Sequence, residues 1–138
     1  MKQLPNTQSA LVLRTDFSDE AAWDSISHAI VAPVEGFRAY VDLVSDPDFD
    51  GVTAREAVAL NPEGFPRTFM FIVDRTALSD PHHPILVLDL YHDPGRTFRV
   101  VPSQMWSVEN NLSIANMDFF EFADSVDEGG VFRGFPES

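Results

Sequence analysis

Carboxylates stand at alternate positions of the segment 46–51, which reads D-P-D-F-D-G. This pattern opens a calcium loop, in which alternate carboxylates point at one hard cation and the glycine permits a sharp turn. Such a loop also needs a bidentate glutamate at its twelfth position, where this chain has Ala57. Glu56 comes one residue early and fits better as the capping-box partner of Thr53. A solvated acidic turn is therefore the alternative interpretation.

A second group with metal-binding chemistry lies further along the chain, at Asp80, His82 and His83. Together with Asp16 or the 46–51 loop, one of these histidines would complete a His/carboxylate site. Adjacent residues of an extended chain face opposite ways, so at most one histidine would bind the ion. The candidate ligands of a divalent cation are Asp16, Asp46, Asp48, Asp50, His82 and His83.

No complete catalytic constellation is recognisable, so the catalytic residues are unknown and a non-enzymatic role is favoured. The sequence has no G-x-S-x-G, P-loop or G-x-G-x-x-G motif. Asp16 follows the first predicted strand, as a phospho-accepting aspartate would, but a receiver-type site also needs a late lysine and the only lysine is Lys2. The absence of cysteine excludes disulfides and thiolate sites and fits a reducing compartment.

Amides and aromatic residues gather in the last third of the chain. Buried amides must be hydrogen-bonded, so the three asparagines are expected to tie a loop to the sheet. The alternative is a polar pocket for a small ligand. Phe120 lies off the apolar face of its helix, so that it is expected to be exposed or to contact a partner. The candidate ligand or partner residues are Trp106, Glu109, Asn110, Asn111, Asn116 and Phe120.

The strongly acidic composition limits the possible partners. The 22 Asp and Glu residues face only 9 Lys and Arg, for a formal net charge of −13. This charge repels nucleic acid and anionic lipid, and it favours a basic protein or a cation, or serves solubility alone. No apolar stretch approaches the roughly 18 residues that span a bilayer, and no signal peptide is recognisable. We therefore expect a cytoplasmic protein that binds neither nucleic acid nor membranes.

The 138 residues fit a single globular domain, with residues 1–9 expected to be flexible. Apolar runs and turn residues predict the order β-α-β-α-β-β-β-α-α. Helical crossovers allow the first three strands to be parallel, whereas short connections make the last three an antiparallel meander. The expected fold is α/β (or α+β), a mixed five-stranded sheet covered by helices. The predicted strands are 10–14, 37–44, 68–73, 84–91 and 97–101, and the helices are 19–31 with Ser18 as its cap, 53–60, 103–112 and one starting at 118.

This topology places the candidate metal ligands at one edge of the sheet. The carboxyl ends of strands one, two, three and five meet there, with Asp16, the 46–50 loop, Asp74 and the 75–83 loop. The turn that contains Asp89, His92 and Asp93 belongs to the opposite edge. Open α/β sheets bind ligands at the carboxyl ends of parallel strands, so a site is expected at the first edge.

Several segments resemble a small actinobacterial family of uncharacterised proteins, a domain of unknown function. The likeness covers nearly the whole chain and implies a bacterial cytosolic single domain, but no activity. The D-P-D-F-D-G segment is not a feature of that family. The segments that carry the resemblance are 14–19 with Trp23, 37–41, 96–103, 108–119 and 130–135.

Two functions are compatible with these observations. The first is a non-enzymatic interaction module, of an immunity, antitoxin-like or regulatory kind, that binds a basic protein and needs no cofactor. The alternative is a divalent-cation-dependent enzyme or binder that uses the carboxylates at the strand ends.

Overall fold

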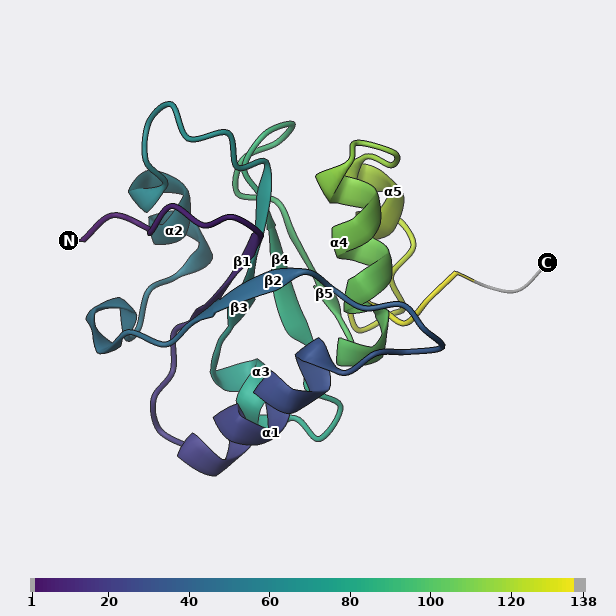
Figure 1. The fold of residues 1–138 in the computed structure, drawn as a ribbon, viewed down its shortest axis with the longest axis horizontal. Coiled ribbons are helices and arrows are strands. Elements are labelled where there is room, and N and C mark those ends of the chain that lie inside the picture. Colours follow the sequence, from purple (N-terminus) through teal and green to yellow (C-terminus); the bar gives the residue numbers. More distant parts are fainter. Residues whose placement is uncertain (1, 136–138) are drawn as a thin grey trace.

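The computed structural model describes residues 2–135 as one mixed sheet with helices on both faces (Figure 1). The six strands lie in the order β2-β1-β3-β4-β5-β6. The strands are β1 (Ala10–Arg14), β2 (Val41–Val44), β3 (Phe69–Val73), β4 (Ile85–Asp89), β5 (Thr97–Val100) and β6 (Val131–Phe132). The helices are α1 (Glu20–Val31), α2 (Ala54–Leu60), α3 (Arg75–Ser79), α4 (Met105–Ser113) and α5 (Phe119–Ala123), with 3₁₀ helices η1 (Pro47–Phe49) and η2 (Pro102–Gln104).

The strand directions agree with the prediction, but the number of strands does not. β1 pairs in parallel with both β2 and β3, and β3, β4 and β5 form an antiparallel meander. A sixth strand, β6, adds in parallel to β5. Five strands were predicted because β6 contains two residues, too few for an alternating pattern to be recognised. The expected α/β class is confirmed, with one further strand and the short helix α3 in place of a loop.

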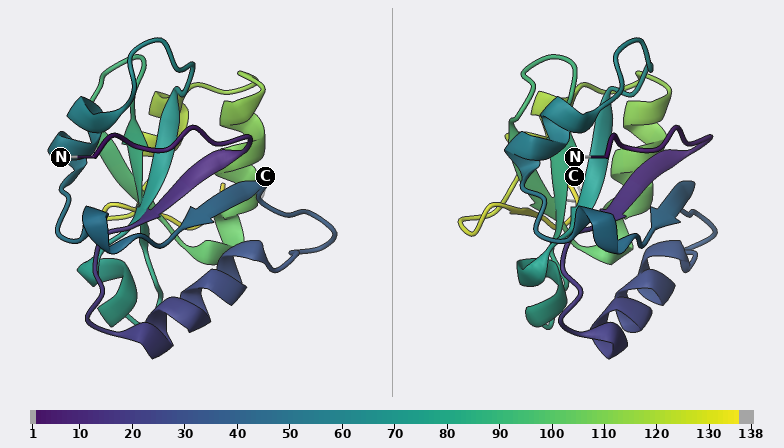
Figure 2. Two further views of the ribbon diagram at one scale, coloured as in Figure 1. Left: turned by 60° about the vertical axis from the view of Figure 1, so that its left-hand side comes forward. Right: turned by 90° about the vertical axis from the view of Figure 1, so that its left-hand side faces the viewer.

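The central strands are buried on both sides. In β3, Phe69, Phe71 and Val73 face one core, whereas Met70 and Ile72 face the other. Successive side chains of a strand point to opposite faces, so a continuous apolar run is what two cores require. The larger core lies beneath α1, α3, α4 and α5, and the smaller one beneath α2 (Figures 1 and 2).

Two predicted elements begin at other residues. The side chain of Asp19, and not that of Ser18, caps α1 by accepting a hydrogen bond from Ala22 N–H, because Ser18 itself donates to Asp16. The predicted helix start at Ser103 is a 3₁₀ turn, and α4 follows without a side-chain cap.

The predicted strand 37–44 is correct only in its second half. Val34 and Phe37 pair across a tight turn whose two central residues, Glu35 and Gly36, have positive φ. The amide of Tyr40 then donates to the side chain of Glu109 and not to a neighbouring strand. A contact with a residue so distant along the chain leaves no trace in local β propensity.

The N-terminal segment is anchored to the domain, whereas residues 1–9 were expected to be flexible. Leu4 is buried in the smaller core, and its amide donates to the carbonyl of Leu60 at 2.9 Å. The guanidinium of Arg67 donates to the carbonyl of Pro5 at 2.6 Å. The segment therefore lies over α2 and leads into β1.

The end of α4 offers a test of backbone strain. Ala115, just after the helix, has a φ of 55°, which is the left-handed region that glycine adopts without strain. Ala115→Gly should therefore raise the free energy of unfolding by roughly 0.5–1 kcal/mol, despite the greater freedom of glycine in the unfolded chain. Urea unfolding monitored by tryptophan fluorescence measures the change.

Ala59→Gly is the matched control, because Ala59 is exposed within α2 and its replacement should destabilise the domain by about 1 kcal/mol. Equal destabilisation by both substitutions would contradict the strain at Ala115.

Candidate functional site

The carboxyl edge of the parallel strands has the arrangement that the sequence predicted. β1, β2 and β3 end side by side, and the amide of Gly51 donates to the carbonyl of Thr15 at 2.8 Å. Asp16 and the 46–51 loop therefore lie next to each other. Whether this edge forms a binding site depends on what its polar side chains already contact.

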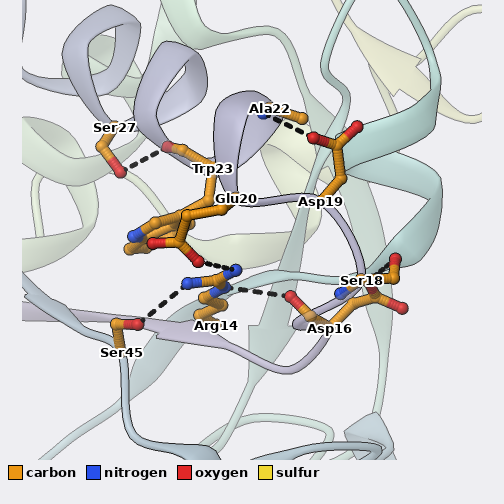
Figure 3. A network of polar contacts seen from close by, with 9 residues as sticks. All are labelled: Arg14, Asp16, Ser18, Asp19, Glu20, Ala22, Trp23, Ser27 and Ser45. Carbon is orange, nitrogen blue, oxygen red and sulfur yellow. Dashed lines mark hydrogen bonds and ion pairs between the residues drawn. The ribbon is translucent and has the colours of Figure 1, made fainter.

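Arg14 organises this edge (Figure 3). Its side chain is 1% exposed and donates to the carbonyl of Asp16, the hydroxyl of Ser45 and the carboxylate of Glu20. The guanidinium also lies over two aromatic rings, 4.3 Å from the Phe17 centroid and 5.1 Å from that of Trp23. Such stacking suits a planar, weakly hydrated cation. Arg14 thus holds the β1–α1 connection to the end of β2.

The acidic loop is a capped turn. The carboxylate of Asp46 accepts a hydrogen bond from the amide of Asp48, caps η1, and forms an ion pair with Lys2. The carboxylate of Asp48 lies 3.7 Å from the same ammonium. Within residues 2–135, no group of three or more His, Asp or Glu side chains is placed to hold a metal ion. The alternative of an acidic turn is therefore the one that the geometry favours.

The two candidate histidines also have local roles. Nδ1 of His83 lies 2.8 Å from the carbonyl of Ala77, and the backbone of His83 has a positive φ. The amide of His82 donates to the carboxylate of Asp80, which makes a turn after α3. Neither histidine is part of a metal-binding group in the described chain. A divalent-cation site from Asp16, Asp46, Asp48, Asp50, His82 and His83 thus gains no support from their positions.

Asp16 should make stability depend on pH in acid. The hydroxyl and the amide of Ser18 donate to its carboxylate and lower the pKa of Asp16 below its ordinary value of 3.8. A lowered pKa stabilises the fold fully above pH 3.8, and this stabilisation is lost as the pH falls toward the folded-state pKa. Wild type should therefore be more stable than Asp16→Asn at pH 7, and the difference should shrink by pH 3, as urea titrations would measure.

Asp24→Asn is the control for this comparison, because the Asp24 carboxylate accepts no hydrogen bond from residues 2–135. A difference between wild type and Asp16→Asn that stays constant from pH 7 to pH 3 would contradict the assignment.

A cavity lies at the other edge of the sheet, beside the amino ends of β1 and β3. Its volume is about 370 Å³, within the range of small-molecule sites, which runs from roughly 300 to 1,000 Å³. Four segments far apart in the sequence surround it. The lining residues are Thr7, Gln8, Ser9, Ala10, Tyr40, Phe65, Pro66, Arg67, Thr68, Phe69, Glu109 and Ser113.

Glu109 is the charged group at the α4 side of this cavity. It is only 4% exposed, and its carboxylate accepts hydrogen bonds from the amide of Tyr40 at 2.6 Å, the side chain of Asn110 at 2.9 Å and the hydroxyl of Ser113 at 2.6 Å. Asn110 also donates to the carbonyl of Arg38. These bonds tie α4 to the segment that leads into β2. Asn110 is thus the one of the three asparagines whose side chain ties a loop to the sheet.

The other members of the predicted polar cluster do not reach the cavity. Asn111 donates to the carbonyl of Ser107 and accepts from the side chain of Asn116, which closes the end of α4. Trp106 stacks on Phe37 with centroids 4.5 Å apart, and its indole Nε1 is buried without a hydrogen-bond partner among the described residues. Phe120 is exposed, as predicted.

Arg67 is the other charged residue that lines the cavity, and sequence reasoning missed it. Its guanidinium donates to the side chain of Asn61 and to the N-terminal segment at Pro5 and Thr7, all neutral oxygens. The guanidinium also lies 4.6 Å from the centroid of the Phe65 ring, and burial lowers the pKa of Arg67. The only available signal was an arginine two residues before an all-apolar strand, which by itself indicates nothing specific.

A second, smaller cavity of about 210 Å³ continues along the same edge. It shares Thr68, Phe69 and Ser113 with the first and is bordered on its far side by the β4–β5 turn and the start of α5. There His92 Nε2 lies 3.5 Å from the carboxylate of Asp118. The two cavities therefore adjoin one another along the amino edge.

A family model described as a domain of unknown function, DUF6924, matches residues 9–135. The chain belongs to this family. No curated protein matches the chain. The DUF6924 match includes both the Arg14 network and the Glu109 network. Segment 14–19 and Trp23, which carried part of the resemblance, contribute to the Arg14 network. Segments 37–41 and 108–119 contribute to the Glu109 network. Along residues 2–135, no helix has the length and apolar character needed to cross a bilayer.

Proposed function

We propose that this DUF6924 domain is a non-enzymatic interaction module that binds a basic protein. The observation that carries the proposal is a set of exposed apolar side chains bordered by carboxylates, which we call the α4–α5 surface. Ile114 is 75% exposed, Tyr91 66% and Phe120 51%. The surface comprises Tyr91, His92, Ile114, Asp118, Phe120 and Glu121.

These residues belong together because two of them meet directly. His92 contacts Asp118 at 3.5 Å, and Tyr91 and Asp118 border the same 210 Å³ cavity. Ser113 and Ala115, on either side of Ile114, border this cavity as well. Phe120 and Glu121 follow on α5, whose Phe119 and Phe122 are buried and so turn the others outward. Exposed aromatic and aliphatic side chains ringed by charge have the anatomy of a protein interface.

The balance of charges favours a basic partner. Five of the nine basic side chains already pair with this chain's own carboxylates. Arg67 is bonded to neutral oxygens, so that Arg38, Arg55 and Arg75 are left without an ion pair within residues 2–135. The uncompensated charge is therefore negative, and it would steer a basic protein toward the surface and make binding sensitive to salt.

The biological setting belongs to the same proposal. We infer a cytoplasmic protein of actinobacteria with an immunity, antitoxin-like or regulatory role. These roles share the requirement for a tight, charge-complementary partner, and identification of that partner distinguishes among them.

The experiment starts with capture of partners from native lysate by the immobilised full chain at low and at high salt. A purified basic partner is then titrated into wild type, Phe120→Ala, Ile114→Ala and Val31→Ala by calorimetry. Val31 is an equally apolar, exposed residue on α1, outside the α4–α5 surface, and serves as the matched control.

Each substitution in the surface should weaken binding about tenfold, the effect of removing an interface anchor worth about 1.4 kcal/mol, and Val31→Ala should not. Recovery of no basic protein at low salt would refute the proposal. Equal weakening by Val31→Ala would refute the assignment to this surface.

A further inference from the structure

We propose that the 370 Å³ cavity at the amino edge binds a small zwitterion, a free amino acid, between Glu109 and Arg67. This inference goes beyond the binding of a basic protein and does not depend on it. It rests on two opposite charges that line one cavity without neutralising each other.

The negative charge lacks a counter-charge. The Glu109 carboxylate is almost fully buried, and all three of its hydrogen-bond donors, at Tyr40, Asn110 and Ser113, are neutral. Within residues 2–135, no Lys, Arg or His nitrogen lies within 4.0 Å of this carboxylate. Buried charges are normally paired, because burial deprives them of water. An ammonium group in the cavity would supply the missing charge.

The positive charge of Arg67, which lines the same cavity, is in the same situation. The half-buried Arg67 donates only to neutral oxygens, of Asn61, Pro5 and Thr7, and its Nε makes no hydrogen bond to residues 2–135. No carboxylate of the described chain lies within 4.0 Å of it. Guanidinium groups bind carboxylates through charge-assisted hydrogen bonds, and Arg67 keeps donors available for one.

The remaining walls suit an amino acid better than a larger ligand. The volume of about 370 Å³ is near the lower limit for small-molecule sites. Hydroxyl groups of Thr7, Ser9 and Thr68 line it together with the rings of Phe65 and Phe69, so it offers both hydrogen bonds and apolar contact. A ligand with one charge would leave either Glu109 or Arg67 uncompensated, whereas an ammonium and a carboxylate on one small molecule satisfy both.

The test uses the full chain and defined probes. The probes are the twenty amino acids together with β-alanine and 4-aminobutyrate, in which the two charges lie further apart. Each probe is added at about 10 mM during thermal unfolding, because a ligand that binds only the folded state raises the Tm as its concentration rises. The best amino acid is then compared with its N-acetyl derivative, which lacks the ammonium, and with its amide, which lacks the carboxylate. Both derivatives should bind at least tenfold more weakly.

Glu109→Gln tests the protein side, because glutamine keeps the shape and most of the hydrogen bonds but removes the charge, and the Ser113 hydroxyl can turn to accept. It should weaken binding at least tenfold, whereas Glu128→Gln, an equal change at an exposed residue outside the cavity, should leave binding unchanged. The absence of a Tm shift with every probe overturns the proposal, and so does equal binding of the blocked derivatives to wild type. The comparison with the blocked derivatives uses wild type alone, so it tests the proposal even if Glu109→Gln fails to fold.

Discussion

Arg14→Ala should lower the free energy of unfolding by about 3–4 kcal/mol and the Tm by about 10 °C, as measured by urea and thermal unfolding. The side chain is fully buried, lies over the rings of Phe17 and Trp23, and bonds the carbonyl of Asp16. Its removal opens a cavity beneath α1 and leaves the β1–α1 connection without its main attachment. The loss should therefore resemble that of a large core side chain.

Two further variants separate packing from charge. Glu20, the ionic partner of Arg14, has a 71% exposed side chain, and exposed ion pairs contribute little, so Glu20→Gln should cost under about 1 kcal/mol. Arg14→Met keeps an apolar stem against the rings and should recover part of the stability. If Glu20→Gln were as destabilising as Arg14→Ala, the ion pair and not the buried stem would hold the edge together.

Asp89→Ala should be the second most damaging change, at about 2–3 kcal/mol. The buried Asp89 carboxylate accepts hydrogen bonds from three successive amides, those of Tyr91, His92 and Asp93, at 2.9, 3.2 and 2.9 Å. Bonds to a charged acceptor are stronger than neutral ones, and three donors lose theirs at once. Because this turn carries Tyr91 and His92, the variant should also weaken partner binding at the α4–α5 surface.

Chemical denaturation of Asp89→Asn and Asp93→Ala completes the comparison. Asparagine keeps one acceptor oxygen, so about half of the loss should remain. Asp93 lies in the same turn with an exposed side chain that accepts no hydrogen bond from residues 2–135, and its replacement should cost less than about 0.5 kcal/mol. A cost at Asp93 that matched the cost at Asp89 would show that the loss of stability does not come from the three amide hydrogen bonds to Asp89.

Local patterns predicted the elements that are long or capped. The apolar run 68–73 is a strand buried on both faces, and both capping boxes, Thr53 with Glu56 and Asp118 with Glu121, start helices as their spacing indicated. α3 and β6 were missed because five and two residues are too few to show a period. Residues 37–40 were misassigned because their partner, Glu109, is distant in the sequence.

The candidate site was less predictable than the fold. Parallel strands place Asp16 beside the 46–51 loop, as expected, but the polar groups there bond one another and leave little for a ligand. The cavity forms where the N-terminal segment, the approach to β3 and the middle of α4 converge, and no local spacing records that convergence. Of the predicted residues only Glu109 lines it, and Arg67 became visible only in three dimensions.

The ion pair between Lys2 and Asp46 determines how the protein can be attached to a solid support. Lys2 is the only lysine, and the hydrogen bond that it donates to the Asp46 carboxylate raises its pKa, so that its amine is protonated and a poor nucleophile at neutral pH. Amine-reactive coupling at this side chain should therefore require an alkaline buffer. Lys2 contacts the loop at the carboxyl edge, so a chip or resin coupled through its amine would leave the opposite edge facing the solution.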